Sequence, residues 1–159
     1  MHEIERKFLV TEPLLDIVKK TKGKRVEQCY LPKTGDWNIR VRRARGGGQI
    51  MCTQTMKQRI SDMKCIELET SVSEEYFEKV SLLCGAVLEK TRFGILYKGH
   101  LWEIDHFHQS AFKGLVMAEI ELKSEDEHFE IPEWLGKEVT QDKNYKNVRM
   151  AKRLRTGND

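Results

Sequence analysis

Polar and apolar residues alternate over most of the chain, a pattern typical of β-strands that bury one face. Turn-forming residues separate the alternating segments at short intervals. We expect strands at residues 2–10, 25–33, 36–45, 49–59, 63–72, 87–98, 100–108 and 114–123. Eight strands at this spacing predict a mainly β, α+β fold in which an antiparallel sheet closes into a barrel.

Other segments follow a helical pattern, and we expect helices over residues 12–20, 73–83 and about 144–154. Ser73 is the expected N-cap of the second helix, and Glu74 and Glu75 place negative charge in its first turn. A short turn of helix is expected after Pro132, with Trp134 and Leu135 packing inward.

A run of three glycines, Gly46–Gly48, lies between two predicted strands. This position is typical of a hairpin turn. A phosphate-binding loop is the alternative, but the Lys-Ser/Thr pair of a P-loop does not follow the glycines.

The polar positions of the predicted strands are unusual because nearly all of them carry a charge. Side chains alternate along a strand, so charged residues two positions apart share one face. The intervening residues are mostly Ile, Val, Leu and Trp, which suits a face covered by helices. The charged face must then point into the barrel, lined by the acids Glu3, Glu5, Glu67, Glu69, Glu103, Asp105, Glu119 and Glu121 and the bases Lys7, Arg40, Arg42, Lys57, Lys90 and Arg92.

The charges of this lining indicate a site for cations and a polyanion. Eight acids against six bases leave two negative charges (8 − 6 = 2), which two divalent cations would reverse. Carboxylates without His or Cys clusters suit Mg²⁺ or Mn²⁺, and Arg and Lys contact phosphate oxygens. One such pair in a strand is usually a solvated face, but repetition over seven strands favours a metal-dependent phosphate enzyme.

The order of these segments resembles the CYTH family, also called triphosphate tunnel metalloenzymes. EIERK at 3–7 is similar to the family's ExExK signature, and the matching segments that follow are IRVRR (39–43), TMK (55–57), IELE (66–69), KTR (90–92), WEIDHF (102–107) and AEIELK (118–123). The resemblance covers almost the whole chain. It implies an eight-stranded tunnel with helices packed outside, and hydrolysis or rearrangement of triphosphates with two Mg²⁺ or Mn²⁺ ions.

The resemblance also implies roles for individual residues. The metal-binding acids would be Glu3, Glu5, Glu103, Asp105, Glu119 and Glu121. The triphosphate ligands would be Lys7, Arg40, Arg42, Lys57, Lys90 and Arg92, of which Lys7 and Lys90 would also act in catalysis. Glu67 and Glu69 would position a second ion or the attacking water, and Tyr30 would help Lys90 to activate that water. Cys29 replaces the glycine that usually precedes this tyrosine.

Outside this set, His106 and His108 have the opposite parity to Asp105 and are expected to face away from the interior. The basic C-terminal segment could contact nucleic acid, but it is more typical of an amphipathic helix. The residues expected to pack inward from it are Val148, Met150, Ala151 and Leu154. Lys143 and Arg149 could attract anions to one tunnel mouth, so Lys143 is a further candidate substrate ligand.

The composition argues against some classes of protein. A net charge of +3 argues against a dedicated nucleic-acid protein, and no segment approaches the ~20 apolar residues of a membrane span. The four cysteines have no CxxC spacing and are expected to be reduced thiols. We expect a single domain over residues 1–159, located in the cytoplasm as a monomer or homodimer.

Inorganic triphosphate is the expected substrate, because no adenine or thiamine pocket can be recognised and this compound needs none. The alternatives are a class IV adenylyl cyclase, a thiamine triphosphatase, and a non-catalytic module that binds polyphosphate or nucleotides.

Overall fold

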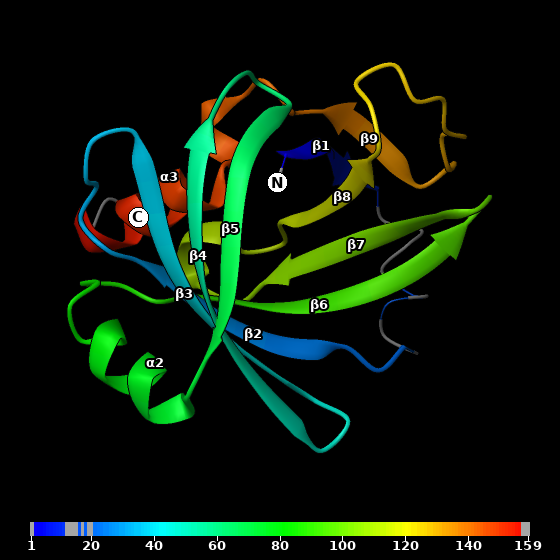
Figure 1. Cartoon of the computed structure of the whole chain (residues 1–159). Helices are drawn as coiled ribbons and strands as arrows, with labels where there is room; N and C mark the ends of the chain where they lie inside the picture. Colours follow the sequence, from blue (N-terminus) through cyan, green and yellow to red (C-terminus); the bar gives the residue numbers. More distant parts are fainter. Residues whose placement is uncertain (1, 12–15, 17, 19–20, 157–159) are drawn as a thin grey trace.

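The computed structural model describes residues 2–11, 16, 18 and 21–156. Its strands form one antiparallel sheet (Figure 1). They are β1 (His2–Val10), β2 (Lys24–Tyr30), β3 (Trp37–Gly46), β4 (Gln49–Arg59), β5 (Lys64–Val72), β6 (Leu88–Tyr97), β7 (His100–Phe107), β8 (Val116–Leu122) and β9 (Leu135–Glu138).

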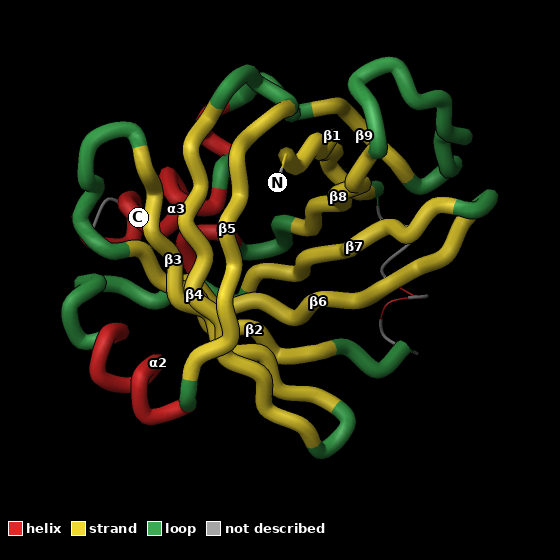
Figure 2. Tube along the Cα trace, in the orientation of Figure 1, coloured by secondary structure: helices red, strands yellow, loops and turns green. Residues whose placement is uncertain are grey.

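The first eight strands close into a barrel, which confirms the predicted fold class. The sheet runs in the order β5-β4-β3-β2-β6-β7-β8-β1, and β1 returns to pair with β5. His2 lies opposite Ile66 in this closing pair, and Glu3 lies opposite Cys65. Figure 2 shows the strands curving round together, with α2 on the outside.

A hydrogen-bonded turn follows Pro132 as predicted, because the Leu135 N–H donates to the Pro132 carbonyl at 3.1 Å, but the chain then continues as the strand β9, which we did not predict. Leu135 pairs with Val10 and Glu138 with Phe8, so β9 occupies the edge of β1 that β5 leaves free. Trp134 and Leu135 do pack against the core, as expected. The strand forms because β1 offers an unpaired edge, which local sequence does not reveal.

The hairpin of β3 and β4 confirms the turn predicted at the glycine run. Gly47 and Gly48 both have positive φ, 61° and 76°, which suits the tight turns that join antiparallel strands. The run therefore serves the turn between Gly46 and Gln49.

Helix α2 (Glu74–Ser81) begins at its predicted N-cap, where the Ser73 side chain accepts a hydrogen bond from the backbone N–H of Tyr76. Helix α3 (Asn147–Thr156) follows a short 3₁₀ turn, η2 (Lys143–Tyr145), so it begins three residues later than predicted. Of the helix predicted over 12–20, Asp16 and Val18 are helical; the rest of that prediction lies outside the described residues.

Apolar side chains pack on the outer face of the barrel. The charged face of the sheet therefore points inward, as the alternation predicted. Phe77 of α2 packs on Val41, Cys29 and Cys52. A second outer cluster surrounds Trp102, which is fully buried. All four cysteines are free thiols.

Helix α3 packs differently from α2, because it meets side chains of the inner face. Met150 and Ala151 contact a cluster that includes Tyr30, Leu88 and Phe107. These residues share the parity of the charged lining, so α3 closes one end of the barrel with an apolar plug. Within the part of the chain that the structure describes, no helix has the length and apolar character needed to cross a membrane.

Candidate active site

The strand register brings the predicted charged residues together on the inner face. Arg40 lies opposite Thr55, which lies opposite Glu69; in the neighbouring row, Lys57 lies opposite Glu67. On the other side of the barrel, Glu103 and Lys7 both lie opposite Glu119. Directly opposed side chains point to the same face of a sheet.

One part of this lining is a buried ion-pair cluster, formed by Lys7, Lys90, Arg92, Asp105 and Glu119. Lys7 Nζ lies 2.7 Å from Glu119 and Lys90 Nζ lies 2.6 Å from Asp105. Arg92 joins the two pairs, with contacts of 2.7 Å to Asp105 and 2.9 Å to Glu119. Each charge is compensated by at least one opposite charge, which buried ions require.

The pKa values of this cluster reflect both burial and pairing. Burial alone would raise the pKa of Glu119, but Lys7 and Arg92 hold it well below its usual range. Burial lowers the pKa of Lys90 to about 8, and the neighbouring Arg92 acts in the same direction. Lys90 is therefore the cation of the cluster that gives up a proton most readily, which suits its predicted role in activating water.

The second part is an open ion-pair cluster, formed by Glu3, Arg40, Arg42, Lys57, Glu67 and Glu69. Lys57 Nζ lies between two carboxylates, 2.5 Å from Glu3 and 2.7 Å from Glu67. The guanidinium groups of Arg40 and Arg42 lie 3.6 Å and 3.5 Å from Glu69, so these contacts are looser. The members of this cluster keep partial exposure, so solvent reaches them.

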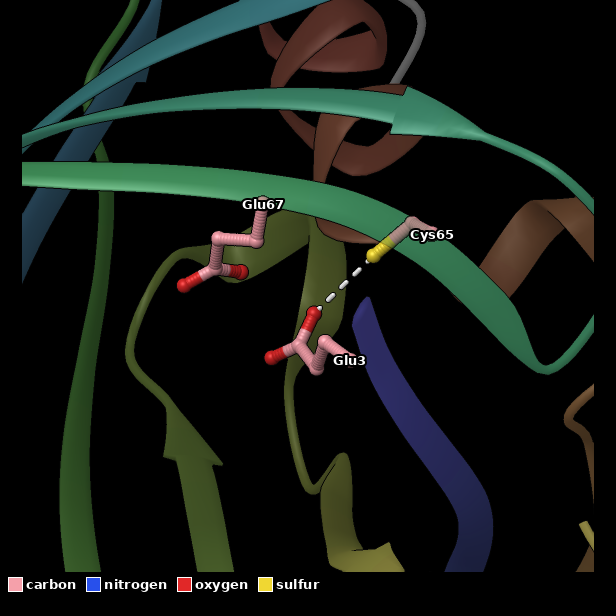
Figure 3. A group of neighbouring side chains, drawn as sticks. All are labelled: Glu3, Cys65 and Glu67. Atoms are coloured by element: carbon pink, nitrogen blue, oxygen red, sulfur yellow. Dashed lines mark hydrogen bonds between the residues drawn. The ribbon is translucent and has the colours of Figure 1, made fainter. Parts of the chain in front are cut away.

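The open cluster contains a group of side chains that could hold a divalent cation (Figure 3). Glu3, Cys65 and Glu67 each offer a ligand atom, and these atoms all lie within 4.8 Å of one another. The Cys65 thiol donates to Glu3 at 3.1 Å, and burial together with this bond raises its pKa to about 12. The carboxylates are therefore the ready ligands, and they suit Mg²⁺ or Mn²⁺.

Nearby acids strengthen the fit to a cation. Burial raises the pKa of Glu121, and the negative charges of Glu67 and Glu103 raise it further. Burial also raises the pKa of Glu3, and Glu5 adds to the effect although Lys57 opposes it. Carboxylates that repel one another in this way are stabilised when a cation binds among them.

Tyr30 lies at the boundary between the charged lining and the apolar plug. Its hydroxyl accepts a hydrogen bond from Gln28 Nε2 at 3.2 Å, and its backbone carbonyl accepts one from Arg155 at 3.2 Å. Burial raises the pKa of Tyr30. Its predicted partnership with Lys90 stays a prediction, because its hydrogen bonds are to Gln28 and Arg155.

Two lysines of the C-terminal segment differ in their relation to the site. Lys143, the predicted ligand, is exposed in η2. Lys146 is partly buried and donates to the backbone carbonyl of Asp62 at 3.3 Å. Lys7 Nζ donates to the backbone carbonyl of the preceding residue, Tyr145, at 3.4 Å, so Lys146 lies near the buried cluster, and burial and the charge of Lys7 lower its pKa.

His106 and His108 lie on the outer face, as their parity predicted. His108 exchanges a hydrogen bond of 2.7 Å with Thr91, and its ring is 5.3 Å from that of His106. Sequence reasoning missed Gln28 and Lys146. The parity of Gln28 with Tyr30 was the available signal for the first, whereas no pattern marked the second.

Comparisons with known proteins point to one family. Residues 1–155 match the model of the CYTH domain. The chain is 35% identical over 152 residues to an inorganic triphosphatase of Acetivibrio thermocellus, covering 94% of this chain and 93% of the relative. It is 35% identical over 158 residues to an inorganic triphosphatase of Nitrosomonas europaea, covering 95% and 97%. A crystal structure of an inorganic triphosphatase superimposes with a TM-score of 0.61 at 32% identity, covering 94% and 93%.

Proposed function

Because this chain belongs to the CYTH domain family, we propose that it hydrolyses inorganic triphosphate to pyrophosphate and phosphate inside the barrel. One observation carries the proposal: acids and bases converge on the same inner face, in an open cluster that solvent reaches. Full-length relatives with 35% identity are inorganic triphosphatases, which supports this substrate.

The carboxylates of the open cluster are the ones we propose to hold divalent cations. Glu3 and Glu67 of this cluster and the neighbouring Glu5 and Glu121 are the first candidates; burial raises the pKa of Glu3 and of Glu121, and a bound cation would offset that cost of ionisation. Asp105, Glu119 and Glu103 were also predicted to bind metal, but all three contact Arg92. Two Mg²⁺ or Mn²⁺ ions bound here would neutralise phosphate oxygens and polarise the phosphorus that is attacked.

The basic side chains of the open cluster are proposed ligands of the triphosphate. Lys57 bridges Glu3 and Glu67, so its ammonium occupies a position that favours positive charge. If divalent cations were held by these carboxylates, Lys57 would be free to contact a phosphate oxygen. Arg40 and Arg42, whose contacts to Glu69 are long, can exchange partners in the same way.

The buried cluster holds the other proposed ligands, Lys7, Lys90 and Arg92, in fixed positions. Their charges stay aimed at the interior without reorganisation, which is how preorganised groups stabilise a transition state. Lys90, Glu67 and Glu69 are the proposed groups that orient or deprotonate the attacking water. The lowered pKa of Lys90, caused by burial, supports its place in this step.

A product assay tests the proposal. Purified protein is incubated with inorganic triphosphate and Mg²⁺ or Mn²⁺, and the products are identified by phosphorus NMR. We expect equal amounts of pyrophosphate and phosphate, and no turnover in EDTA. With ATP as substrate, cyclic AMP as the main product would contradict the proposal in favour of a cyclase. Binding without turnover under every metal would indicate a binding module.

A matched pair of variants on β1 tests the metal site. Glu5→Gln removes an inner carboxylate, and we expect turnover to fall by about 100-fold or more because a metal ligand is lost. Arg6→Gln changes the adjacent outer residue, which pairs with Glu138 of β9, and should leave turnover near that of the wild type. Near wild-type activity of Glu5→Gln, with circular dichroism unchanged, would remove Glu5 from the site.

A further inference from the structure

Gln28 and Tyr30 lie on neighbouring inner positions of β2, beside the two arginines of β3. Gln28 pairs with Arg42, and Tyr30 pairs with Arg40. The side chain of Gln28 is 0% exposed, and that of Tyr30 is also buried. Both side chains therefore face the charged lining from the edge of the apolar plug.

The hydrogen bond between them directs the tyrosine proton away from Gln28. Gln28 Nε2 donates to the Tyr30 hydroxyl at 3.2 Å, which uses the oxygen as an acceptor. The hydroxyl proton is left free to point elsewhere. A buried Gln28 would be an unusual choice for packing alone, because its Oε1 has no hydrogen-bond partner among the described residues.

The surroundings of the Tyr30 hydroxyl favour an anion. The positive charges of Arg40, Lys57 and Lys7 act on it, and the negative charge of Glu119 opposes them more weakly. The ring is held on the other side by the plug, where Met150 and Phe107 belong to the same cluster. A bond from Arg155 to the Tyr30 carbonyl adds a further constraint on its position.

The geometry points to Tyr30 as a neutral hydrogen-bond donor to the triphosphate, and to Gln28 as the positioning residue that turns the hydroxyl proton into the barrel. This inference rests on the proposed function and differs from a role of Tyr30 as a base. Burial, which raises the pKa of Tyr30, keeps the phenol protonated and able to donate. Gln28 acts through Tyr30 and need not touch the substrate.

The test compares Tyr30→Phe, Gln28→Met and the double variant. Pyrophosphate, which the proposed reaction does not consume, is the probe for binding by calorimetry in Mg²⁺. Tyr30→Phe should weaken its binding by about tenfold, since a hydrogen bond to a charged group is lost. Gln28→Met should cause a similar loss, and the double variant should be no worse than Tyr30→Phe. In Tyr30→Phe, the dependence of kcat on pH on the alkaline side should have the same shape as in the wild type.

A second hydrogen-bonded glutamine and tyrosine, on the outer face of the barrel, provide the control. Gln54 of β4 accepts a hydrogen bond of 2.6 Å from the hydroxyl of Tyr76 in α2. Gln54→Met should therefore leave pyrophosphate binding and turnover unchanged.

Three outcomes would overturn the inference. Unchanged binding in Tyr30→Phe removes the donor role, and additive losses in the double variant remove the positioning role of Gln28. Loss of the alkaline limb in Tyr30→Phe identifies Tyr30 as a base. Failure of the proposed function can be told apart from failure of this inference. If the wild type binds pyrophosphate but does not hydrolyse triphosphate, the binding of the variants can still be compared with that of the wild type.

Discussion

The buried and open ion-pair clusters face one another across the same barrel but differ in how their charges are held. In the buried cluster, the side chains of Lys7 and Asp105 are 2% and 0% exposed. In the open cluster, those of Lys57 and Glu69 are 27% and 35% exposed. Within the buried cluster the contacts to Arg92 are 2.7 to 2.9 Å, whereas the arginine contacts to Glu69 in the open cluster are 3.5 to 3.6 Å.

This difference indicates a division of roles within one site. Charges without water must keep their partners, because an unpaired buried ion is very unfavourable. Charges that water reaches can leave one partner for another at little cost. We therefore propose that the buried cluster holds its phosphate ligands in fixed positions, and that the open cluster exchanges its internal ion pairs for metal and phosphate.

The largest expected difference between the two clusters is in their contribution to the free energy of unfolding. Arg92→Met leaves Asp105 and Glu119 short of a partner, and we expect a loss of about 3–5 kcal/mol in the free energy of unfolding. Arg42→Met, in the open cluster, should cost less than about 1 kcal/mol. Urea denaturation followed by circular dichroism measures both, and pyrophosphate binding should weaken in Arg42→Met although its fold is intact. Equal losses of stability would remove the distinction.

The response to pH extends the comparison to two glutamates, Glu119 of the buried cluster and Glu121 beside the open cluster, whose contributions to stability should change with pH in opposite directions. Lys7 and Arg92 depress the pKa of Glu119 against the effect of burial, so its contribution to stability is present above its unfolded pKa and is lost as pH falls through the folded pKa. Burial raises the pKa of Glu121, so its contribution is present below the unfolded pKa and is lost as pH rises through the folded pKa.

Glu121→Gln tests this sign. In EDTA at about pH 7 the variant should be more stable than the wild type by under about 1 kcal/mol, and at about pH 4 the two should be equal. It should also gain less thermal stability from Mg²⁺ than the wild type, because a cation ligand is missing. Glu130→Gln, an exposed change outside the barrel strands, is the control. A variant less stable than the wild type at neutral pH would contradict the repulsion inferred at Glu121.

The smallest expected effect separates the two lysines before α3. Lys146→Met should weaken pyrophosphate binding by about threefold at low salt, with the difference shrinking as salt screens the charge. Lys143→Met should leave binding unchanged, because Lys143 is exposed in η2. Calorimetry at two salt concentrations measures both. The reverse order would return Lys143 to the site and place Lys146 outside it.

Strand parity made much of this architecture predictable. Glu3, Glu5 and Lys7 could be assigned to one face because side chains alternate along a strand, and the same rule placed His106 on the other face. The hairpin at Gly47 and Gly48 followed from local turn chemistry.

Contacts between distant segments were not predictable in this way. The short strand β9 exists because β1 has a free edge at Phe8 and Val10, and no local pattern in Leu135–Glu138 reports that edge. The same applies to Arg92, whose sequence position shows a charge but not that it gathers three acids. Which cation takes which acid depends on the stagger of the strands, and periodicity alone does not determine it.

The two-part pairing of β1 has a consequence for how the molecule assembles. β1 pairs with β5 at its start and with β8, which is distant from it in sequence, over most of its length. Contacts so distant in sequence form late and slowly. On the ribosome, the strands made before β8 can only form an open sheet, with charged residues on one face and apolar residues on the other. The charged interior, and with it the proposed polyanion site, therefore forms in a single late step, when β8 joins β1 to β7 and the interior is enclosed.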